Sequence, residues 1–247
     1  MEPEVVSQLL ALNRQFYQTQ GREFSSTRLR LQPGVLRLLE RIASGNRILD
    51  LGCGNAQLAR QLSQMGFNRE YIGLDASSAM LAEIGKTPLD LPDFSFIYAD
   101  LSTPNWDEGL MGGGTAASKA GFDRILAFAV LHHLPGDDLR RQVLHKVRRL
   151  ISENGYFIHS EWQFLNSPRL LKRIQPWETI GLSERQIEPG DYLLDWRRGG
   201  YSLRYVHSFT QEELSCLARE TGFKIMETFL SDGENGRLGL YQVWAPV

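Results

Sequence analysis

The sequence has few cysteines and no long apolar run. Its 247 residues include only two cysteines, Cys53 and Cys216, which lie far apart and lack the spacing of metal ligands. This argues against a disulfide scaffold and favours a reducing compartment. A membrane-spanning helix needs about 20 consecutive apolar residues, and residues 1–20 lack the basic start and apolar core of a signal peptide. We therefore expect a cytoplasmic protein without a membrane segment.

A strong net charge is also missing. The chain has 27 Lys and Arg against 29 Asp and Glu, which gives a formal net charge of −2. An overall attraction to nucleic acid is therefore not expected, and any such binding has to use a local basic patch. The length suits one α/β domain, alone or with an insertion.

Short apolar segments alternate with amphipathic ones along most of the chain. Apolar runs bounded by turn residues predict strands, and apolar residues three and four apart predict helices. Gly21 is expected to end the first helix, and Asn154-Gly155 to form a turn before a strand. The pattern predicts helices over about 3–19, 33–42, 55–65, 77–81, 137–150 and 210–221, and strands over 47–51, 71–75, 94–99, 122–129, 156–162, 224–230 and 238–244.

These elements predict the fold class. Strand–helix units followed by a hairpin indicate a doubly wound α/β sheet of seven strands, mostly parallel with a C-terminal antiparallel hairpin and with helices on both faces. Residues 163–208 break the alternation and contain three prolines, so we interpret them as a lid inserted after the fifth strand. The expected organisation is an N-terminal helical cap over residues 1–44 and a ligand-binding domain over residues 45–247.

Residues 47–56, Arg-Ile-Leu-Asp-Leu-Gly-Cys-Gly-Asn-Ala, are the most informative segment. They indicate a buried strand that enters a glycine turn and then a helix. Gly52 and Gly54 permit a tight turn and the close approach of a ligand, because glycine has no Cβ. Asp50, near the end of the strand, is a poor neighbour for a phosphate and a good one for a cation or a hydroxyl.

Two more acids end the next two strands. Asp75 lies about 20 residues past the glycine turn, the spacing at which an acid binds the ribose hydroxyls of a nucleoside. Asp100 ends the third strand, where it can accept a hydrogen bond from an adenine amino group. Each acid alone is explained as a helix cap, but three acids in one cleft favour a ligand with a cationic centre. A dinucleotide is disfavoured, since Gln57 stands where its fingerprint has a third glycine.

The order of an apolar strand, Asp-x-Gly-x-Gly-Asn and further acids at strand ends resembles class I S-adenosylmethionine (SAM) methyltransferases. The resemblance implies a Rossmann-like fold, SAM as the cofactor and residues 45–247 as the SAM-binding domain. The cofactor site that it implies consists of Tyr17, Arg28, Asp50, Gly52, Gly54, Asn55, Asp75, Ala76, Asp100, Leu101 and Ala127.

Four further segments narrow the resemblance. They are residues 16–28 (FYQTQGREFSSTR), 129–134 (AVLHHL), 190–196 (GDYLLDW) and 204–209 (RYVHSF). Together they look like the tRNA methyltransferases that esterify 5-carboxymethyluridine at the wobble position. Leu194-Asp195 departs from that family, which has Val-Pro there. The resemblance also implies tRNA and a small zinc-containing activator subunit as partners.

The chemistry of that family needs no general base. Its acceptor is a carboxylate, which is already nucleophilic at neutral pH because its pKa is about 4. The carboxylate has to be oriented by cations, and the fork of an Arg side chain matches its two oxygens. By resemblance, Tyr17 and Arg28 cap the methionine end of SAM or the substrate carboxylate; Arg28 is alternatively an exposed linker residue. The catalytic residues implied are Arg28, His132, Arg204, Tyr205 and His207.

Several alternatives are open at this point. A small-molecule O- or N-methyltransferase of the same fold fits an aromatic lid that encloses an apolar substrate, and a non-enzymatic SAM-binding subunit is a third hypothesis. One of His132 and His133 is expected to be structural. Trp177 and Trp196 are core anchors or base-stacking platforms. The basic residues of the helix over 137–150 form a solvated face or an RNA-backbone patch.

Overall fold

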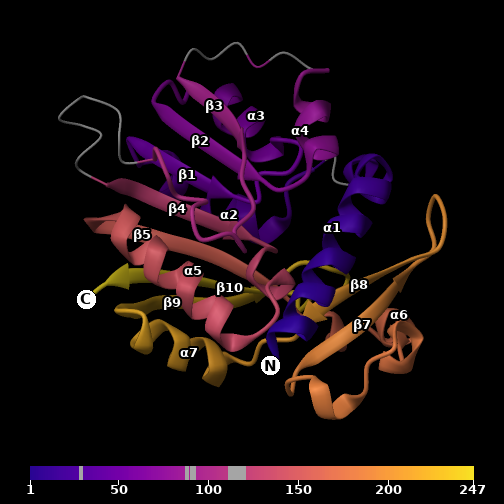
Figure 1. Ribbon diagram of the computed structural model, residues 1–247. Coiled ribbons are helices and arrows are strands. Elements are labelled where there is room, and N and C mark those ends of the chain that lie inside the picture. Colours follow the sequence, from indigo (N-terminus) through magenta and orange to yellow (C-terminus); the bar gives the residue numbers. More distant parts are fainter. Residues whose placement is uncertain (28–29, 87–88, 90–92, 111–120) are drawn as a thin grey trace.

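The computed structural model describes residues 1–27, 30–86, 89, 93–110 and 121–247. Its main body is a seven-stranded sheet in the order β3-β2-β1-β4-β5-β10-β9 (Figure 1). β1 to β5 are parallel, and β10 is antiparallel to β5 and β9, which confirms the predicted fold class. The strands are β1 Arg47–Leu51, β2 Glu70–Asp75, β3 Phe94–Tyr98, β4 Phe122–Phe128, β5 Ile151–Trp162, β9 Phe223–Ser231 and β10 Gly239–Pro246.

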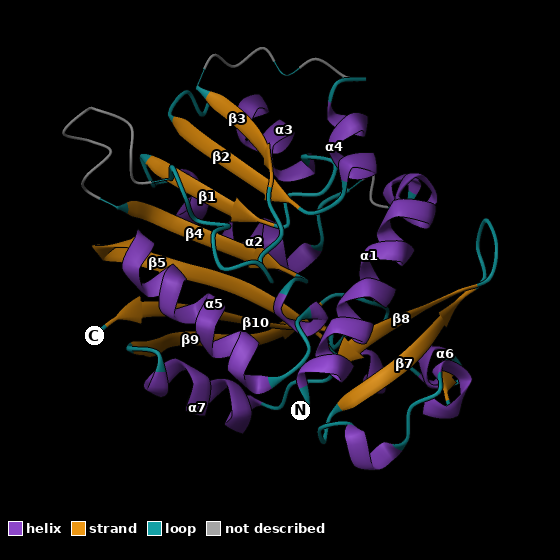
Figure 2. Cartoon of the chain, viewed as in Figure 1, coloured by secondary structure: helices purple, strands orange, loops and turns teal. Residues whose placement is uncertain are grey.

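Helices cover both faces of this sheet (Figure 2). On one face, α5 and α7 contribute Val143 and Leu214 to a hydrophobic cluster with Phe157. On the other face, α2 and α3 contribute Leu38 and Leu58 to a second cluster, to which α4 also belongs. The helices are α2 Pro33–Ala43, α3 Gln57–Gln64, α4 Ser78–Ile84, α5 Asp137–Leu150 and α7 Gln211–Glu220.

A second, three-stranded sheet in the order β6-β7-β8 lies within residues 163–208. The first helix, α1 (Pro3–Ser26), lies between the two sheets (Figure 1). Its residues Val5 and Leu9 pack against Trp177 and Leu193 of the second sheet and its turns. The remaining elements are α6 Pro168–Leu171, β6 Ile174–Gln175, β7 Asp191–Trp196, β8 Ser202–His207 and the 3₁₀ turns η2 Leu131–His133, η3 Phe164–Asn166, η4 Trp177–Ile180 and η5 Glu184–Gln186.

The expectation that Gly21 ends the first helix is wrong, because α1 continues to Ser26. Gly21 is buried inside the helix, and a Cβ placed there would lie 3.3 Å from the Cβ of Ala79 and 3.5 Å from the hydroxyl of Ser77. The glycine therefore allows α1 to pack closely on the start of α4 and does not serve as a helix stop.

The expected turn at Asn154-Gly155 is also wrong, since β5 begins at Ile151 and includes both residues. The pairing of β5 with β4 shifts register between Phe122 and Arg124, as in a β-bulge. A Cβ at Gly155 would lie 2.8 Å from the carbonyl oxygen of Phe122. The glycine is needed here for the close approach of two strands.

No helix among the described residues is long and apolar enough to cross a membrane. The Gly- and Ala-rich segment 111–120 lies outside the described residues.

The contact between α2 and β10 allows a stability test. A Cβ at Gly34 would lie 2.3 Å from the ring of Tyr241, which is buried and donates a hydrogen bond to Asp232 (2.6 Å). We expect Gly34→Ala to lower the free energy of unfolding by about 1–3 kcal/mol, because overpacking displaces core neighbours. The matched control is Gly85→Ala, whose Cβ would be 3.9 Å from its nearest neighbour. Urea denaturation of both variants measures the effect, and equal stability of the two would contradict the tight contact.

Candidate active site

The described residues enclose a cavity of about 390 Å³ at the carboxyl ends of β1, β2 and β4. Ligands bind at this edge in doubly wound sheets. α1 forms one wall, and β8 contributes a residue to another. The predicted residues that line the cavity are Tyr17, Asp50, Gly52, Gly54, Asn55, Asp75, Ala76, Asp100, Leu101, His132 and Arg204.

The glycine turn after β1 is fastened to β2. The backbone N–H groups of Gly52 and Cys53 both donate to the carbonyl oxygen of Leu74, at 2.7 and 2.9 Å. Gly52 has φ +71°, and a Cβ there would lie 2.6 Å from a methyl carbon of Val130. The turn therefore excludes side chains and leaves bare backbone facing the cavity.

Asp75 holds the same turn from the end of β2. Its carboxylate accepts hydrogen bonds from the N–H of Gly54 (2.9 Å) and the N–H of Ser77 (2.8 Å). Burial raises its pKa above the ordinary value, and these two hydrogen bonds lower it in part. Asp75 thus organises the turn and still lines the cavity.

Asp50 is fully buried and accepts a hydrogen bond from the hydroxyl of Tyr71. Burial raises its pKa from 3.8 to about 7, the Tyr71 hydrogen bond lowers it in part, and repulsion from Asp75 adds to the rise. A carboxyl group in this condition takes up or releases its proton near neutral pH. A cation in the cavity favours its ionised form.

Asp100 differs from the other two acids. It accepts hydrogen bonds from the N–H and hydroxyl of Ser102, at 2.9 and 2.6 Å, and forms an ion pair with Arg14 at 3.0 Å. Burial alone would raise its pKa, but these hydrogen bonds and the Arg14 charge hold the pKa below its usual value. Asp100 is therefore ionised at neutral pH.

The other half of the cavity carries His132 and His133, and also Glu161, an acid that we did not predict. Tyr17 on α1 lies with its hydroxyl 2.7 Å from Nε2 of His133. Glu161, which is fully buried, accepts a hydrogen bond from the backbone N–H of His132 (3.2 Å) and lies 3.1 Å from its ring. Burial raises the pKa of Glu161 well above the usual range. Its position in the sequence could have identified Glu161 as a site residue, because it lies at the carboxyl end of β5 as Asp75 lies at that of β2.

Arg204 lines the cavity with its guanidinium surrounded by aromatic rings, and it is 6% exposed. Its guanidinium carbon lies 4.7 Å from the ring centre of Trp162 and 5.2 Å from that of Phe16. The rings of Phe24 and Trp196 are each 5.9 Å away. Such a wall favours a planar anion that pairs with the guanidinium.

Three predicted site residues do not lie where they were expected. Tyr205 and His207 are buried and do not line the cavity; they contact Asp191 at 2.6 Å each, on the side away from it. A direct role on the substrate does not fit these positions. Ala127 is likewise buried in the core below the cavity, whose lining begins one residue later at Phe128. Arg28 lies outside the described residues, so its roles stay predictions.

The basic residues of α5 are largely paired within the protein although Arg149 is exposed, and an RNA-backbone patch on this helix stays a prediction. Arg140 is 1% exposed and donates to the hydroxyl of Tyr205 at 2.8 Å. The other four are held by acids or carbonyl oxygens of the protein. They are Arg141, Lys146, Arg148 and Arg149.

The raised pKa of Asp50 predicts a pH dependence of stability. Between pH about 4 and about 7, the folded protein keeps a proton that the unfolded chain has lost, so stability falls as pH rises through this window. The difference at this one site is on the order of 4 kcal/mol. We expect Asp50→Asn to remove that contribution, so the variant gains stability relative to the wild type as pH rises.

Chemical denaturation across this pH range measures the effect. Tyr71→Phe is the companion variant, because it removes the hydrogen bond that lowers the pKa of Asp50 and extends the decline to higher pH. Parallel stability curves for wild type and Asp50→Asn would contradict the prediction.

Comparison with known proteins identifies the family. A family model described as a methyltransferase domain matches residues 24–228. The chain is 26% identical over 214 residues to a putative methyltransferase of Encephalitozoon cuniculi, covering 86% of this chain and 87% of that protein. It is 25% identical over 224 residues to the tRNA (carboxymethyluridine(34)-5-O)-methyltransferase of Schizosaccharomyces pombe, covering 86% and 89%.

A solved structure shows the same fold. The crystal structure of a SAM-dependent methyltransferase from Methanosarcina mazei matches with a TM-score of 0.62 and 19% identity, over 89% of this chain and 99% of that one. The family model covers most of the sequence, and the sheet has the order β3-β2-β1-β4-β5-β10-β9. The chain belongs to the class I SAM-dependent methyltransferases.

Proposed function

We propose that this enzyme methylates the carboxylate of 5-carboxymethyluridine at the wobble position of tRNA. The observation that carries the proposal is the buried Arg204 with its aromatic surroundings at the cavity wall. A guanidinium pairs with both oxygens of a carboxylate, and aromatic rings accommodate a pyrimidine ring. One position thus recognises the two chemical features of the proposed acceptor.

The residues around the glycine turn fit SAM. Gly52 and Gly54 leave backbone exposed to the cavity without Cβ atoms, and the space at Gly52 is too narrow for one. The carboxylates of Asp50, Asp75 and Asp100 suit a nucleoside that carries a sulfonium and an ammonium. When bound, SAM supplies a methyl group that is activated by the positive charge on sulfur.

The protein's own task in this reaction is to orient and desolvate the acceptor. A carboxylate attacks without the loss of a proton, so no side chain has to act as a base. Arg204 holds the carboxylate in one orientation, so less orientational entropy is lost when the transition state forms. The rings of Phe24 and Trp162, which line the cavity beside Arg204, exclude water from the acceptor.

One of the relatives supports the same acceptor. The match to the fission yeast tRNA (carboxymethyluridine(34)-5-O)-methyltransferase extends over 89% of that protein, so it includes both the SAM-binding segment and most of the remaining chain. The segments that carry the resemblance, 16–28 and 204–209, contribute Tyr17, Phe24 and Arg204 to the cavity. These residues belong to α1 and β8, outside the seven-stranded sheet.

Methyl transfer from labelled SAM tests the proposal. Three acceptors are compared: tRNA that carries the carboxymethyl group, the same tRNA with unmodified uridine, and the free nucleoside 5-carboxymethyluridine. We expect transfer to the first and, less efficiently, to the third, as an ester that mild base hydrolyses. Transfer only to unrelated small molecules would favour the small-molecule enzyme and overturn the tRNA substrate.

The Arg204→Lys variant tests whether Arg204 orients the acceptor carboxylate or only supplies a positive charge. Lys keeps the positive charge but lacks the fork, so we expect kcat/KM for the carboxymethylated tRNA to fall by about 30- to 1,000-fold, equivalent to about 2–4 kcal/mol. SAM affinity, measured by calorimetry, and the melting temperature are expected to stay close to wild type. A variant with unchanged kcat/KM would show that Arg204 does not orient the acceptor.

Asp75→Ala tests the cofactor half of the cavity. Loss of a charge-assisted hydrogen bond costs about 1.5–3 kcal/mol, so we expect SAM affinity to fall by about 10- to 100-fold. The matched control is Asp138→Ala, an exposed acid in the first turn of α5. Calorimetric titration gives both affinities, and an equal effect of the two substitutions would argue against a contact between Asp75 and SAM.

A further inference from the structure

The tip of the second sheet carries a cluster of basic side chains. We call it the hairpin patch. It combines the turn after β7 with the chain segment before β6, which lie side by side because β6 pairs with β7. The N–H of Asp195 donates to the carbonyl oxygen of Arg173 at 2.9 Å, which fixes the two segments together. The patch consists of Arg169, Lys172, Arg173, Arg197 and Arg198.

One buried acid organises the patch without neutralising it. The carboxylate of Asp195 is fully buried and pairs with Arg173 at 3.2 Å and with Arg197 at 2.7 Å. The side chain of Arg197 is nevertheless 60% exposed, and Arg198 and Lys172 are exposed without an ion pair to any described residue. Two of the five cations, Arg173 and Arg197, pair with Asp195, and the side chain of Glu23 on α1 lies beside the turn at Gly199. The patch therefore keeps an excess of positive charge in a chain whose net charge is −2.

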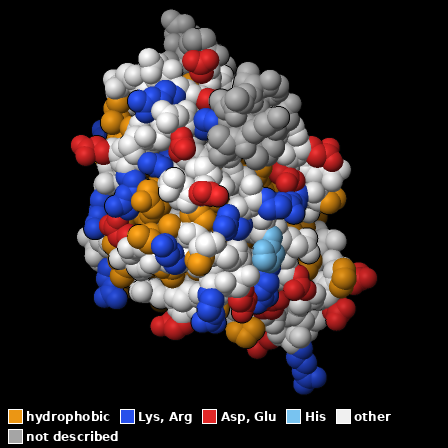
Figure 3. Space-filling view, turned by 90° about the vertical axis from the view of Figure 1, so that its left-hand side faces the viewer, with side chains coloured by type: hydrophobic (Ala, Val, Ile, Leu, Met, Phe, Trp, Pro, Cys, Tyr) orange, Lys and Arg blue, Asp and Glu red, His pale blue; other side chains and the backbone are white. Residues whose placement is uncertain are grey.

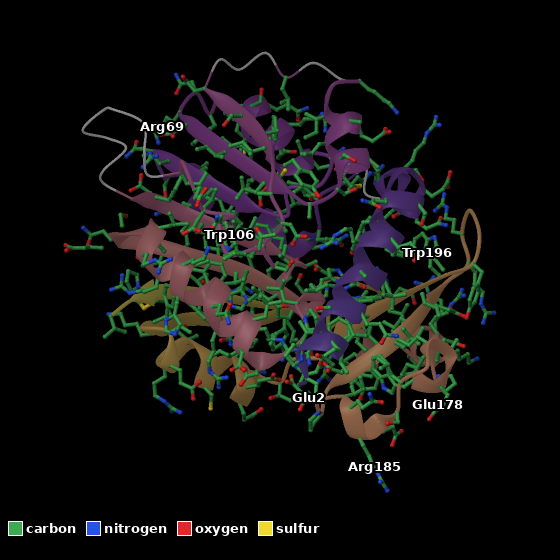
Figure 4. All side chains as sticks on the ribbon, viewed as in Figure 1. Glu2, Arg69, Trp106, Glu178, Arg185 and Trp196 are labelled. Atoms are coloured by element: carbon green, nitrogen blue, oxygen red, sulfur yellow. The ribbon has the colours of Figure 1, made fainter. Side chains whose placement is uncertain are left out.

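The patch begins next to the wall of the cavity. Trp196, labelled in Figure 4 beside α1, immediately precedes Arg197 and lies 5.8 Å from the ring of Phe24, which lines the cavity. The indole N–H of Trp196 donates to the carbonyl oxygen of Arg198 at 2.5 Å. Trp196 is thus an anchor of the turn, and it joins the basic surface to the cavity.

The turn is held in place against α1. Gln20 donates from its side chain to the hydroxyl of Ser202 at 3.1 Å, and Gly199 and Gly200 have φ values of +70° and +130° that favour glycine. Tyr201, at the same tip, is 60% exposed. An exposed aromatic ring beside arginines is the combination that stacks on unpaired bases and binds their phosphates.

The side of the molecule away from β7 and β8 carries a mixture of charges among the described residues. Figure 3 shows the left-hand side of Figure 1, away from β7 and β8, and its basic and acidic side chains are interspersed. On α5 the basic residues there are paired, as with Arg149 and Asp107. The hairpin patch is therefore a local exception to the near-neutral charge of the chain.

We infer that the hairpin patch binds the backbone phosphates of the single-stranded RNA loop whose base enters the cavity. This inference rests on the proposed function, since it assigns the RNA-binding surface for the same reaction. Arginine forks pair with phosphate oxygens in the way that they pair with carboxylates. The patch supplies affinity without base recognition, while the cavity selects the modified base.

The test variant is Lys172→Gln/Arg198→Gln, which removes two exposed cations and leaves the pairs with Asp195 intact. The matched control is Arg149→Gln/Lys224→Gln, two exposed basic residues on α5 and β9. Binding of tRNA is measured by fluorescence anisotropy at several salt concentrations. Methyl transfer is measured in parallel on carboxymethylated tRNA and on the free nucleoside.

We expect the patch variant to bind tRNA about tenfold more weakly, with the slope of log affinity against log salt reduced by about 1 to 2. Transfer to the free nucleoside and SAM affinity should equal those of the wild type, and the control should match the wild type throughout. The single charge reversal Arg198→Glu should weaken tRNA binding in the same direction.

The outcomes separate the two proposals. Unchanged tRNA affinity and salt slope in the patch variant, with normal methylation of tRNA by the wild type, would overturn the patch and leave the proposed function standing. Equal weakening by the patch variant and the control would also overturn it. Wild-type protein that neither binds nor methylates tRNA would overturn both proposals.

Discussion

The buried guanidinium of Arg140 determines how the second sheet is attached to the first. Its Nε donates to the carbonyl oxygen of Leu134 at 3.0 Å, and its Nη2 donates to the hydroxyl of Tyr205 at 2.8 Å and lies 3.4 Å from Asp191. A charge at this depth is stable only where acids and hydrogen-bond acceptors surround it. Burial opposes the charge, yet Tyr205 and Asp191 raise the pKa of Arg140 above its usual value. The helix α5 of the main sheet is thereby tied to β7 and β8.

This attachment explains the positions of the residues in the RYVHSF segment. Successive side chains of a strand point to opposite sides, so Tyr205 and His207 face the Arg140 network while Arg204 faces the cavity. Burial disfavours a charged His207, but its hydrogen bonds to Asp191 and Glu213 raise its pKa above the usual value. Tyr205 and His207 are positioning residues that fix the strand from which Arg204 reaches the cavity.

The sequence predicted the features that depend on neighbouring residues and missed those that depend on distant ones. The glycine turn and the acids at the ends of β1 and β2 follow from local patterns, and the structure has them as predicted. The close packing at Gly21 and the burial of Arg140 depend on contacts with α4 and with β7 and β8, which no local pattern contains. The resemblance assigned catalytic roles to Tyr205 and His207, but the directions of their side chains depend on how β8 is placed in the fold. The cofactor half of the cavity was therefore predictable in detail and the substrate half only in outline.

The two halves of the cavity are formed by different elements of the fold, and this bears on specificity for the methyl acceptor. The SAM half of the cavity is built from strand ends and turns whose geometry the main sheet determines. The other half is formed by α1 and β8, and Asn13 joins them by accepting from the N–H of Tyr205 (2.8 Å) and donating to its carbonyl oxygen (3.1 Å). α1 also contacts η2 through the carbonyl oxygen of His133 (3.2 Å) and pairs with Asp100 through Arg14 (3.0 Å), so it links the second sheet to both halves of the cavity. A fold of this kind hosts many methyl acceptors because its substrate wall is added to the sheet and not part of it.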